Sequence, residues 1–260
     1  MRVLLAVALL LGLVHTPTTA QSDSVTSAGV TSVGKAVPFG TGERMEYIAK
    51  YGWNHIGTGS MEIVGIEDIR GRPAVHTNFR LKGRWFFFSA NYVLDSWVDQ
   101  ATFTSVRFTQ DNDEDPSEKQ RVYEIFPDRQ KYSAKGGEEQ ESVPDPLDEG
   151  ALLQYVRTMD LEVGKTYTLN RYFRPDRNPV IVKVLKEEEI SVPAGKFKTI
   201  VIQPIIKSKG IFSEGGQARI WLSNDKDRIM VQMRVTLKVA TISLQLKKHI
   251  PAPSAPNSPQ

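Results

Sequence analysis

Cysteine is absent from the 260-residue sequence, and this absence removes several structural and chemical options. Without thiols the chain forms no disulfide and offers no thiolate ligand to a metal. A lipoprotein carries its lipid on a cysteine at the cleavage site, so we also expect that the protein is not a lipoprotein. An ordinary hydrophobic core must hold the fold, and a domain of roughly 200 residues is large enough to build one.

An excess of charge of one sign is also missing. The 33 Lys and Arg residues nearly balance the 30 Asp and Glu residues, which gives a formal net charge of +3. Proteins that bind nucleic acid neutralise its phosphates with a surplus of basic residues. The balance therefore predicts no nucleic-acid partner.

Long apolar runs are confined to the first twenty residues. Arg2 precedes an apolar stretch over residues 3–14, and Thr18 and Ala20 stand at the −3 and −1 positions of a signal peptidase site. A helix of residues 3–14 would rise about 18 Å, less than the roughly 30 Å of a bilayer core. We interpret residues 1–20 as a cleaved signal peptide and expect a soluble, exported periplasmic protein without a transmembrane segment. A retained membrane anchor is the alternative.

Composition divides the rest of the chain into three parts. Residues 21–37 are rich in Ser, Thr, Val and Gly, which is typical of a flexible leader. Residues 251–260 hold four prolines, and because proline removes backbone donors we expect a disordered tail. Residues 38–250 are predicted to form a single β-rich domain.

Alternation of apolar and polar residues predicts strands through most of this domain. Near the C-terminus Ile242, Leu244 and Leu246 alternate with polar residues. The same alternation predicts two sets of residues on solvent-exposed (wet) faces of strands. They are Met230, Gln232 and Arg234 in one strand, and Arg219, Trp221 and Ser223 in another. Further strands are expected around residues 43–51, 56–65, 73–82, 90–98, 102–110, 119–126, 165–173, 180–187 and 197–207.

About a dozen such strands, separated by Gly, Pro and Asn-Asp turns, predict a mainly β fold. We expect a large, strongly curved antiparallel sheet, or an open barrel or sandwich, because one wet face per strand is typical of antiparallel sheets. One short helix is predicted near residues 148–158. Asp145 is expected to be its N-cap and Pro146 its first residue, and its apolar face is expected to pack on the sheet.

A series of short motifs resembles one family of bacterial exported proteins. They include Val37-Pro38-Phe39-Gly40, Asp95-Ser96-Trp97-Val98-Asp99, Val143-Pro144-Asp145-Pro146-Leu147, Val192-Pro193-Ala194-Gly195 and Ile220-Trp221-Leu222-Ser223. In their order along residues 38–247 they are similar to the domain of unknown function 3108 family. The resemblance implies an exported, mostly periplasmic β-rich domain of unknown activity, and it supplies no catalytic residues.

Motifs for catalysis and for cofactors are missing, so we expect no enzyme activity, no catalytic residues, no cofactor and no metal site. Nucleophilic catalysis needs an activated hydroxyl or thiol beside a base, but no Gly-x-Ser-x-Gly segment occurs, and His55, His76 and His249 are far apart. The acidic run over residues 111–115 resembles the start of a calcium loop, yet Pro116 stands where such a loop requires glycine. Each glycine-rich segment likewise departs from the phosphate-loop patterns.

Paired carboxylates remain as one enzymatic alternative. Asp95 and Asp99 are a possible pair for hydrolysis of a glycosidic bond, which uses two carboxyl groups. A chain with 30 acidic residues offers many accidental pairs, so this is the second alternative to a binding function.

Consecutive aromatic residues form the most unusual segment, Trp85, Phe86, Phe87 and Phe88. If all four lie in one strand, large aromatic side chains point to both faces of the sheet. Something must then cover the second face: a locally two-sided core, a partner or an apolar ligand. Trp53, beside Gly52 on a predicted turn, is the other aromatic residue that we consider a ligand contact or part of a small satellite cluster.

These patterns favour a non-catalytic binding module for an apolar or amphipathic ligand, or for a component of the cell envelope. A structural or assembly factor of the envelope is the first alternative. The expected partners are a lipid or an envelope protein. Nothing in the sequence indicates an oligomeric state.

Overall fold

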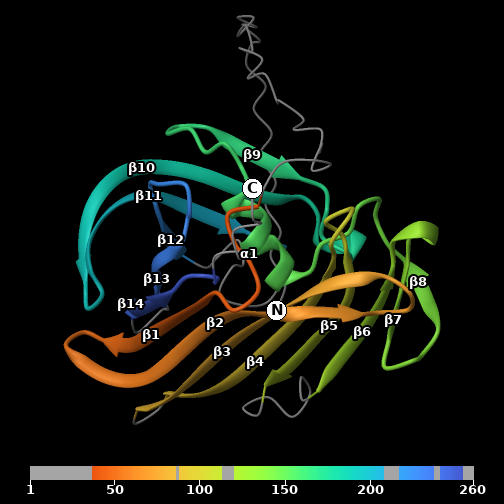
Figure 1. Ribbon diagram of the computed structural model, residues 1–260, viewed down its shortest axis with the longest axis horizontal. Helices are drawn as coiled ribbons and strands as arrows, with labels where there is room; N and C mark the ends of the chain where they lie inside the picture. The colour runs from red at the N-terminus through yellow and green to blue at the C-terminus, as the bar shows by residue number, and fades with distance from the viewer. Residues whose placement is uncertain (1–36, 86–87, 113–119, 208–216, 237–240, 254–260) are drawn as a thin grey trace, which may run out of the picture.

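The computed structural model describes residues 37–85, 88–112, 120–207, 217–236 and 241–253. In these residues the chain forms one antiparallel sheet of 14 strands and one α-helix, α1 (Glu149–Arg157) (Figure 1). The predicted signal peptide, the leader as far as residue 36 and the tail from residue 254 lie outside the described residues. No helix in the described part is both long and apolar enough to cross a bilayer.

The strands form two consecutive runs. The first contains β1 (Arg44–Tyr51), β2 (Asn54–Asp68), β3 (Pro73–Trp85), β4 (Phe88–Asp99), β5 (Ser105–Asn112), β6 (Arg121–Phe126), β7 (Lys131–Ala134) and β8 (Glu139–Glu141). The second contains β9 (Thr166–Leu169), β10 (Val180–Val192), β11 (Gly195–Ile205), β12 (Gln217–Ser223), β13 (Met230–Thr236) and β14 (Thr241–Ile250). Pairing of β1 with β14 joins the two runs into the order β8-β7-β6-β5-β4-β3-β2-β1-β14-β13-β12-β11-β10-β9.

The sheet curves strongly, so that its two runs face each other, and α1 lies between them (Figure 1). The sheet does not close, because β8 and β9 are its two edges. The chain between these edges partly fills the opening, where Leu147 bridges to Tyr172 and the Ser142 hydroxyl donates to the Phe173 carbonyl oxygen at 2.7 Å. This arrangement confirms the prediction of a strongly curved, open antiparallel sheet with one short helix.

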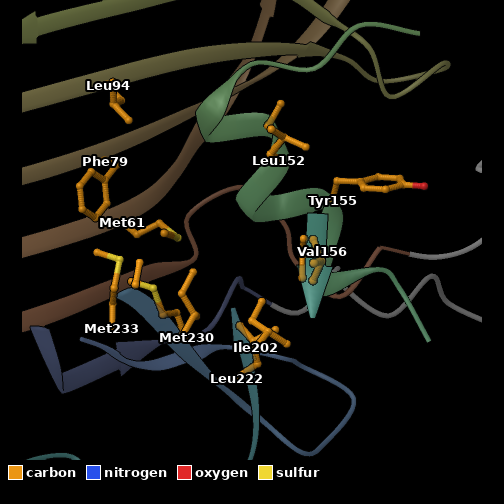
Figure 2. Packing of buried hydrophobic residues seen from close by; sticks show 14 of the residues in the cluster. Met61, Phe79, Leu94, Leu152, Tyr155, Val156, Ile202, Leu222, Met230 and Met233 are labelled. Carbon is orange, nitrogen blue, oxygen red and sulfur yellow. The ribbon is translucent and has the colours of Figure 1, made fainter. Parts of the chain in front are cut away.

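The hydrophobic core fills the concave side of the sheet and includes residues from both runs and from α1. In β1 the alternation is regular: Met45, Tyr47 and Ala49 are buried, whereas their neighbours are partly exposed. Figure 2 shows Phe79 and Leu94 of the first run, Leu152 and Val156 of α1, and Met230 and Met233 of the second run in one cluster. The helix therefore links the two runs through apolar contacts.

Two short, polar strands in the described residues, β7 and β8, were not located in the sequence. Two local expectations about buried faces were wrong. Trp221 and Ser223 are buried on the face predicted to be wet: the Trp221 indole donates to Glu188 Oε1 at 2.7 Å, and Arg234 lies over its ring. Met230 is buried in the core because a bulge between Trp221 and Leu222 shifts the register of the pair.

The helix begins later than predicted. Its N-cap is Asp148, whose side chain accepts a hydrogen bond from the Ala151 amide, and not Asp145. Asp145 has a φ of 50°, in the left-handed region, and Pro146 precedes the helix. Pro146 instead accepts a backbone hydrogen bond from Ser105 at 2.7 Å, which holds this segment against the start of β5.

Candidate functional site

An apolar pocket lies between α1 and the inner face of the second run of strands. Leu152 and Val156 line it from the helix, and Val182, Ile202 and Ile220 line it from β10, β11 and β12. Its volume is about 40 Å³, room for only a few water-sized spheres. Leu152 and Val156 are buried in contact with this core, and burying a side chain of this size contributes about 1.5–3 kcal/mol.

Polar contacts anchor the N-terminal end of α1 to the first run. The Asp148 carboxylate accepts hydrogen bonds from the Ser96 hydroxyl at 2.6 Å and the Ala151 amide at 3.0 Å, and the Asp148 amide donates to the Ser105 hydroxyl at 2.8 Å. Burial raises the pKa of Asp148 to about 6, although these hydrogen bonds oppose that rise. Gly150 allows the close approach, because a Cβ there would lie 2.9 Å from the Ser96 Cβ.

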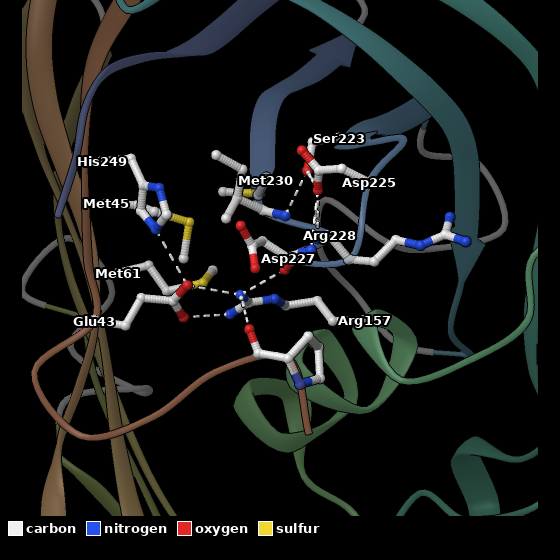
Figure 3. A network of polar contacts seen from close by, with 12 residues as sticks. Glu43, Met45, Met61, Arg157, Ser223, Asp225, Asp227, Arg228, Met230 and His249 are labelled. Carbon is white, nitrogen blue, oxygen red and sulfur yellow. Dashed lines mark hydrogen bonds and ion pairs between the residues drawn. The ribbon is translucent and has the colours of Figure 1, made fainter. Parts of the chain in front are cut away.

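A buried ion pair anchors the C-terminal end of α1 to Glu43, the residue directly before β1 (Figure 3). Arg157 Nη1 donates to Glu43 Oε2 at 2.7 Å and Nη2 donates to Glu43 Oε1 at 2.8 Å. The Asp227 carbonyl oxygen accepts from Nη2 at 2.9 Å, and His249 Nε2 lies 3.2 Å from Glu43 Oε1. Arg157 thus joins the helix to the segment before β1, to the turn before β13 and, through Glu43, to β14.

The geometry of this ion pair is two-pronged, and both side chains are almost fully buried, with 2% of the Arg157 and 3% of the Glu43 side chain exposed. Removing one partner of such a pair leaves an uncompensated buried charge and costs about 3–5 kcal/mol. Arg157 also lines the apolar pocket. Its Nε is buried and has no hydrogen-bond partner among the described residues, so one donor remains available at this end of α1.

A second pocket of about 130 Å³ lies under the segment that leads into β1. Phe39 and Thr41 of this segment line it together with Val75 and Thr77 of β3 and with Phe103. The rings of Phe39 and Phe103 meet edge to face with centroids 6.3 Å apart. This pocket is separated from the first by α1, since Gln154 of the helix lines it.

Trp53, the end of β3 and the start of β4 all lie at the same end of the sheet. Trp85 ends β3, Phe88 begins β4, and the two residues pair across the hairpin, so the four-residue run is not one strand. Phe86 and Phe87 lie outside the described residues. Trp53 is in the turn between β1 and β2, 99% exposed, and lines neither pocket. Val75, which lines the second pocket, is separated from Trp85 by about 33 Å of strand.

The two carboxylates considered for hydrolysis each contact other side chains. Asp95 Oδ1 accepts from Asn78 at 2.6 Å and lies 2.8 Å from His76 Nε2. Burial lowers the pKa of His76, but hydrogen bonds to Asp95 and Glu67 outweigh this effect and raise it above 6.5. The Asp99 carboxylate instead binds Arg72 at 2.8 Å and the amides of the following loop.

The other two kinds of sequence candidate are the acidic run over residues 111–115 and the glycine-rich segments. The described residues of the acidic run and Gly57 of a glycine-rich segment belong to β-strands. Of the acidic run, Asp111 and Asn112 end β5, and residues 113–119 lie outside the described residues. Gly57 and Gly83 pair across β2 and β3, and a Cβ on Gly57 would lie 2.2 Å from the Lys82 carbonyl oxygen. No group of three or more His, Asp or Glu side chains in the described residues is arranged to hold a metal ion.

Sequence reasoning missed the residues that position α1. Glu43 and Arg157 are 114 positions apart, and Ser96 and Asp148 are 52 apart. No local spacing connects them. The one available signal was an arginine beside the apolar positions of a short helix, where a buried partner is required.

Comparison with known proteins shows the family. The model of the family described as "Protein of unknown function (DUF3108)" matches residues 46–247. The chain belongs to the DUF3108 family. This membership confirms the resemblance carried by the ordered motifs. No curated protein matches the chain in sequence.

One solved structure shares the fold of this DUF3108 protein at low sequence identity, and two others are less similar to it. A β-barrel-like protein of domain of unknown function DUF1849 from Brucella abortus is 12% identical, with a TM-score of 0.54 over 84% of this chain and 100% of that one. A candidate lipoprotein from Parabacteroides distasonis is 11% identical, with a TM-score of 0.37 over 82% of this chain and 98% of that one. A protein from Bacteroides fragilis described as exported, with a YmcC-like fold, is 9% identical, with a TM-score of 0.35 over the same shares.

Proposed function

We propose that this DUF3108 protein is an exported, non-catalytic binding protein that holds an apolar or amphipathic molecule between α1 and the inner face of β10–β13. One observation carries the proposal: a pocket lined almost entirely by apolar side chains lies beneath a short helix inside an open, curved sheet. Concave apolar sites with a few polar groups are the usual form of small-molecule sites.

The size of the pocket determines how a ligand would enter. At about 40 Å³ it has no room for an acyl chain, so binding requires α1 to move away from β10–β13. Each end of the helix is fixed by polar side-chain contacts, Asp148 at one end and Arg157 at the other. The opening between β8 and β9 leaves the sheet itself free to widen.

Arg157 supports the amphipathic part of the proposal. It lines the pocket, and its Nε donor is buried without a partner in the described residues. A buried donor without a partner costs about 1–3 kcal/mol, so an acceptor on the polar end of a ligand would relieve that cost. Asp95 and Asp99 contact other side chains, which favours binding over glycan hydrolysis.

Titration with the apolar fluorescent probe N-phenyl-1-naphthylamine tests the proposal. The mature chain is expected to give a saturable rise in probe fluorescence. Val182→Phe fills the pocket from β10, because Val182 is buried and lines it, and is expected to weaken probe binding at least about tenfold. Such overpacking costs about 1–3 kcal/mol, so a thermal melt must show that the variant is folded.

Val64→Phe is the matched control, since Val64 is 43% exposed and lines neither pocket. Its probe affinity should equal that of the parent. Leu222→Ala enlarges the pocket and should strengthen binding of bulkier probes. The proposal would be contradicted if the parent showed no saturable probe binding, or if folded Val182→Phe bound the probe with the affinity of the parent.

A further inference from the structure

The pocket under the segment that leads into β1 is larger than the pocket beneath α1. Its volume is about 130 Å³, against about 40 Å³ for the other. An apolar cavity of about 150 Å³ lined by aliphatic and aromatic side chains holds a benzene molecule. The larger pocket therefore has room for a small ring as the structure stands, without any movement of α1.

Apolar side chains from separate parts of the chain form the walls of this larger pocket. Ile63, Val75 and Val98 come from the neighbouring strands β2, β3 and β4, and Val75 pairs directly with Val98. Phe39 and Phe103 complete the walls with rings that meet edge to face, 6.3 Å between centroids. Because aromatic rings favour offset and edge-to-face contacts with one another, these walls suit an aromatic ligand.

The segment that covers the pocket is held in place by α1, which it passes in Figure 1. Arg157 lies over the ring of Phe39, 5.1 Å from its centroid, and its Nη2 donates to the Pro38 carbonyl oxygen at 3.4 Å. Two lining residues, Val37 and Ile66, are 43% and 52% exposed. They mark an apolar mouth through which a ligand can enter from solvent.

Two buried polar side chains line the same pocket. Thr77 of β3 is 5% exposed, and its hydroxyl forms no hydrogen bond with the part of the chain that the structure describes. Gln154 of α1 is 2% exposed, and its Nε2 donates to the Met61 sulfur at 3.4 Å, a weak acceptor. A buried polar group without a good partner is costly, so a ligand hydroxyl that bonds to Thr77 would be favoured here.

Charge at the pocket is already paired within the chain. Asp99 is the one charged residue among those that line the pocket. Its carboxylate accepts from Arg72 at 2.8 Å and from the amides of Ala101 and Thr102, each at 2.9 Å. A charged ligand would lose its hydration without gaining an unpaired opposite charge, which is unfavourable. The pocket therefore favours a neutral ligand.

We propose that this pocket binds a small neutral aromatic alcohol, a single ring with one hydroxyl group, of which phenol is the simplest. The ring lies against Phe39, Phe103 and the paired valines of β3 and β4, and the hydroxyl bonds to the Thr77 hydroxyl. The site goes beyond the proposed binding function. It takes its ligand on the other side of α1, and without the movement that the pocket beneath α1 requires.

Ligand-observed NMR titrations with phenol and toluene test the site, because toluene has the same size and carries a methyl group in place of the hydroxyl. The mature chain is expected to bind phenol saturably, with a Kd on the order of 1 mM for so small a ligand. Thr77→Val keeps the shape of the side chain and removes its hydroxyl. It should weaken phenol binding roughly five- to tenfold, the effect of one hydrogen bond, and leave toluene binding unchanged or tighter.

Three further variants place the ligand. Thr58→Val is the matched control, since Thr58 of β2 is exposed and lines neither pocket, and it should bind both ligands like the parent. Val75→Phe fills the larger pocket and should abolish binding of both ligands, with a thermal melt to show that it is folded. Val182→Phe fills the pocket beneath α1 and should leave phenol binding unchanged, so this site is tested apart from the proposed function.

The proposal is overturned if the parent shows no saturable phenol binding, or if Thr77→Val binds phenol as tightly as the parent does. It is also overturned if folded Val75→Phe still binds phenol, or if Val182→Phe and not Val75→Phe abolishes that binding, which would place the ligand beneath α1. If Val75→Phe does not fold, the contrast between phenol and toluene in Thr77→Val decides.

Discussion

At the residue scale, Asp148 is the side chain that anchors the N-terminal end of α1. It is fully buried and yet fixes the helix to β4 and β5 through Ser96 and Ser105. Burial raises its pKa to about 6 from an ordinary value of 3.8. The folded protein therefore binds a proton at this carboxyl more tightly than the unfolded chain does.

The sign of the pH dependence follows from that rise. The contribution of Asp148 to the free energy of unfolding is full below pH 3.8 and is lost as the pH rises through about 6. Asp148→Asn keeps the cap and cannot ionise. Urea unfolding of both proteins should show the parent losing on the order of 3 kcal/mol relative to the variant between pH 4 and pH 7. A difference that stays constant with pH would contradict this assignment.

Side chains at this scale were only partly predictable. The sequence indicated a capped helix, but two aspartates stand near its start, Asp145 and Asp148, and Asp145 had the better local pattern because Pro146 follows it. Asp148 became the cap because Ser96 and Ser105, both distant in sequence, complete its contacts. The pairing of Glu43 with Arg157 depends in the same way on a contact between residues 114 positions apart.

At the scale of elements, α1 packs against β4 closely enough to exclude one methyl group. A Cβ on Gly150 would lie 2.9 Å from the Ser96 Cβ. In an isolated helix Gly→Ala stabilises by about 1 kcal/mol. Here Gly150→Ala should instead lower the free energy of unfolding by about 1–3 kcal/mol, because the helix must move off the sheet.

Gly65→Ala provides the comparison for that substitution. A Cβ on Gly65 meets nothing within 4 Å, and its backbone is not in the left-handed region. Urea unfolding should therefore find this variant as stable as the parent, or up to about 1 kcal/mol more stable. If Gly150→Ala were equally harmless, the close contact between α1 and β4 would be incorrect.

Strands were predicted well where one face is wet and poorly where both are covered. Alternation in β1 and β14 is visible in the sequence because only their inner residues contact the core. Trp221 is an exception to the rule that outer-face residues are exposed, because Glu188 and Arg234 cover it on the outer face. The strands β7 and β8 were not predicted because short, polar strands at the edge of a sheet lack an apolar pattern.

At the scale of the whole molecule, the class of fold was predictable and the order of the strands was not. Period-two alternation indicates an antiparallel sheet, but the pairing of β1 with β14 joins opposite ends of the domain. That join makes the two runs face each other around α1 and creates the pocket. Trp53, one of the aromatic residues singled out in the sequence, is exposed in the β1–β2 turn and does not line that pocket.

The central claim is that the pocket beneath α1 holds an apolar or amphipathic molecule. Native mass spectrometry of the mature chain, purified from an exporting bacterium without detergent, tests it most directly. The account predicts a bound species of discrete added mass on the parent, an apolar or amphipathic molecule after extraction, and its loss from folded Val182→Phe but not from Val64→Phe. A parent chain that carries no added mass and acquires none from a total lipid extract would contradict it.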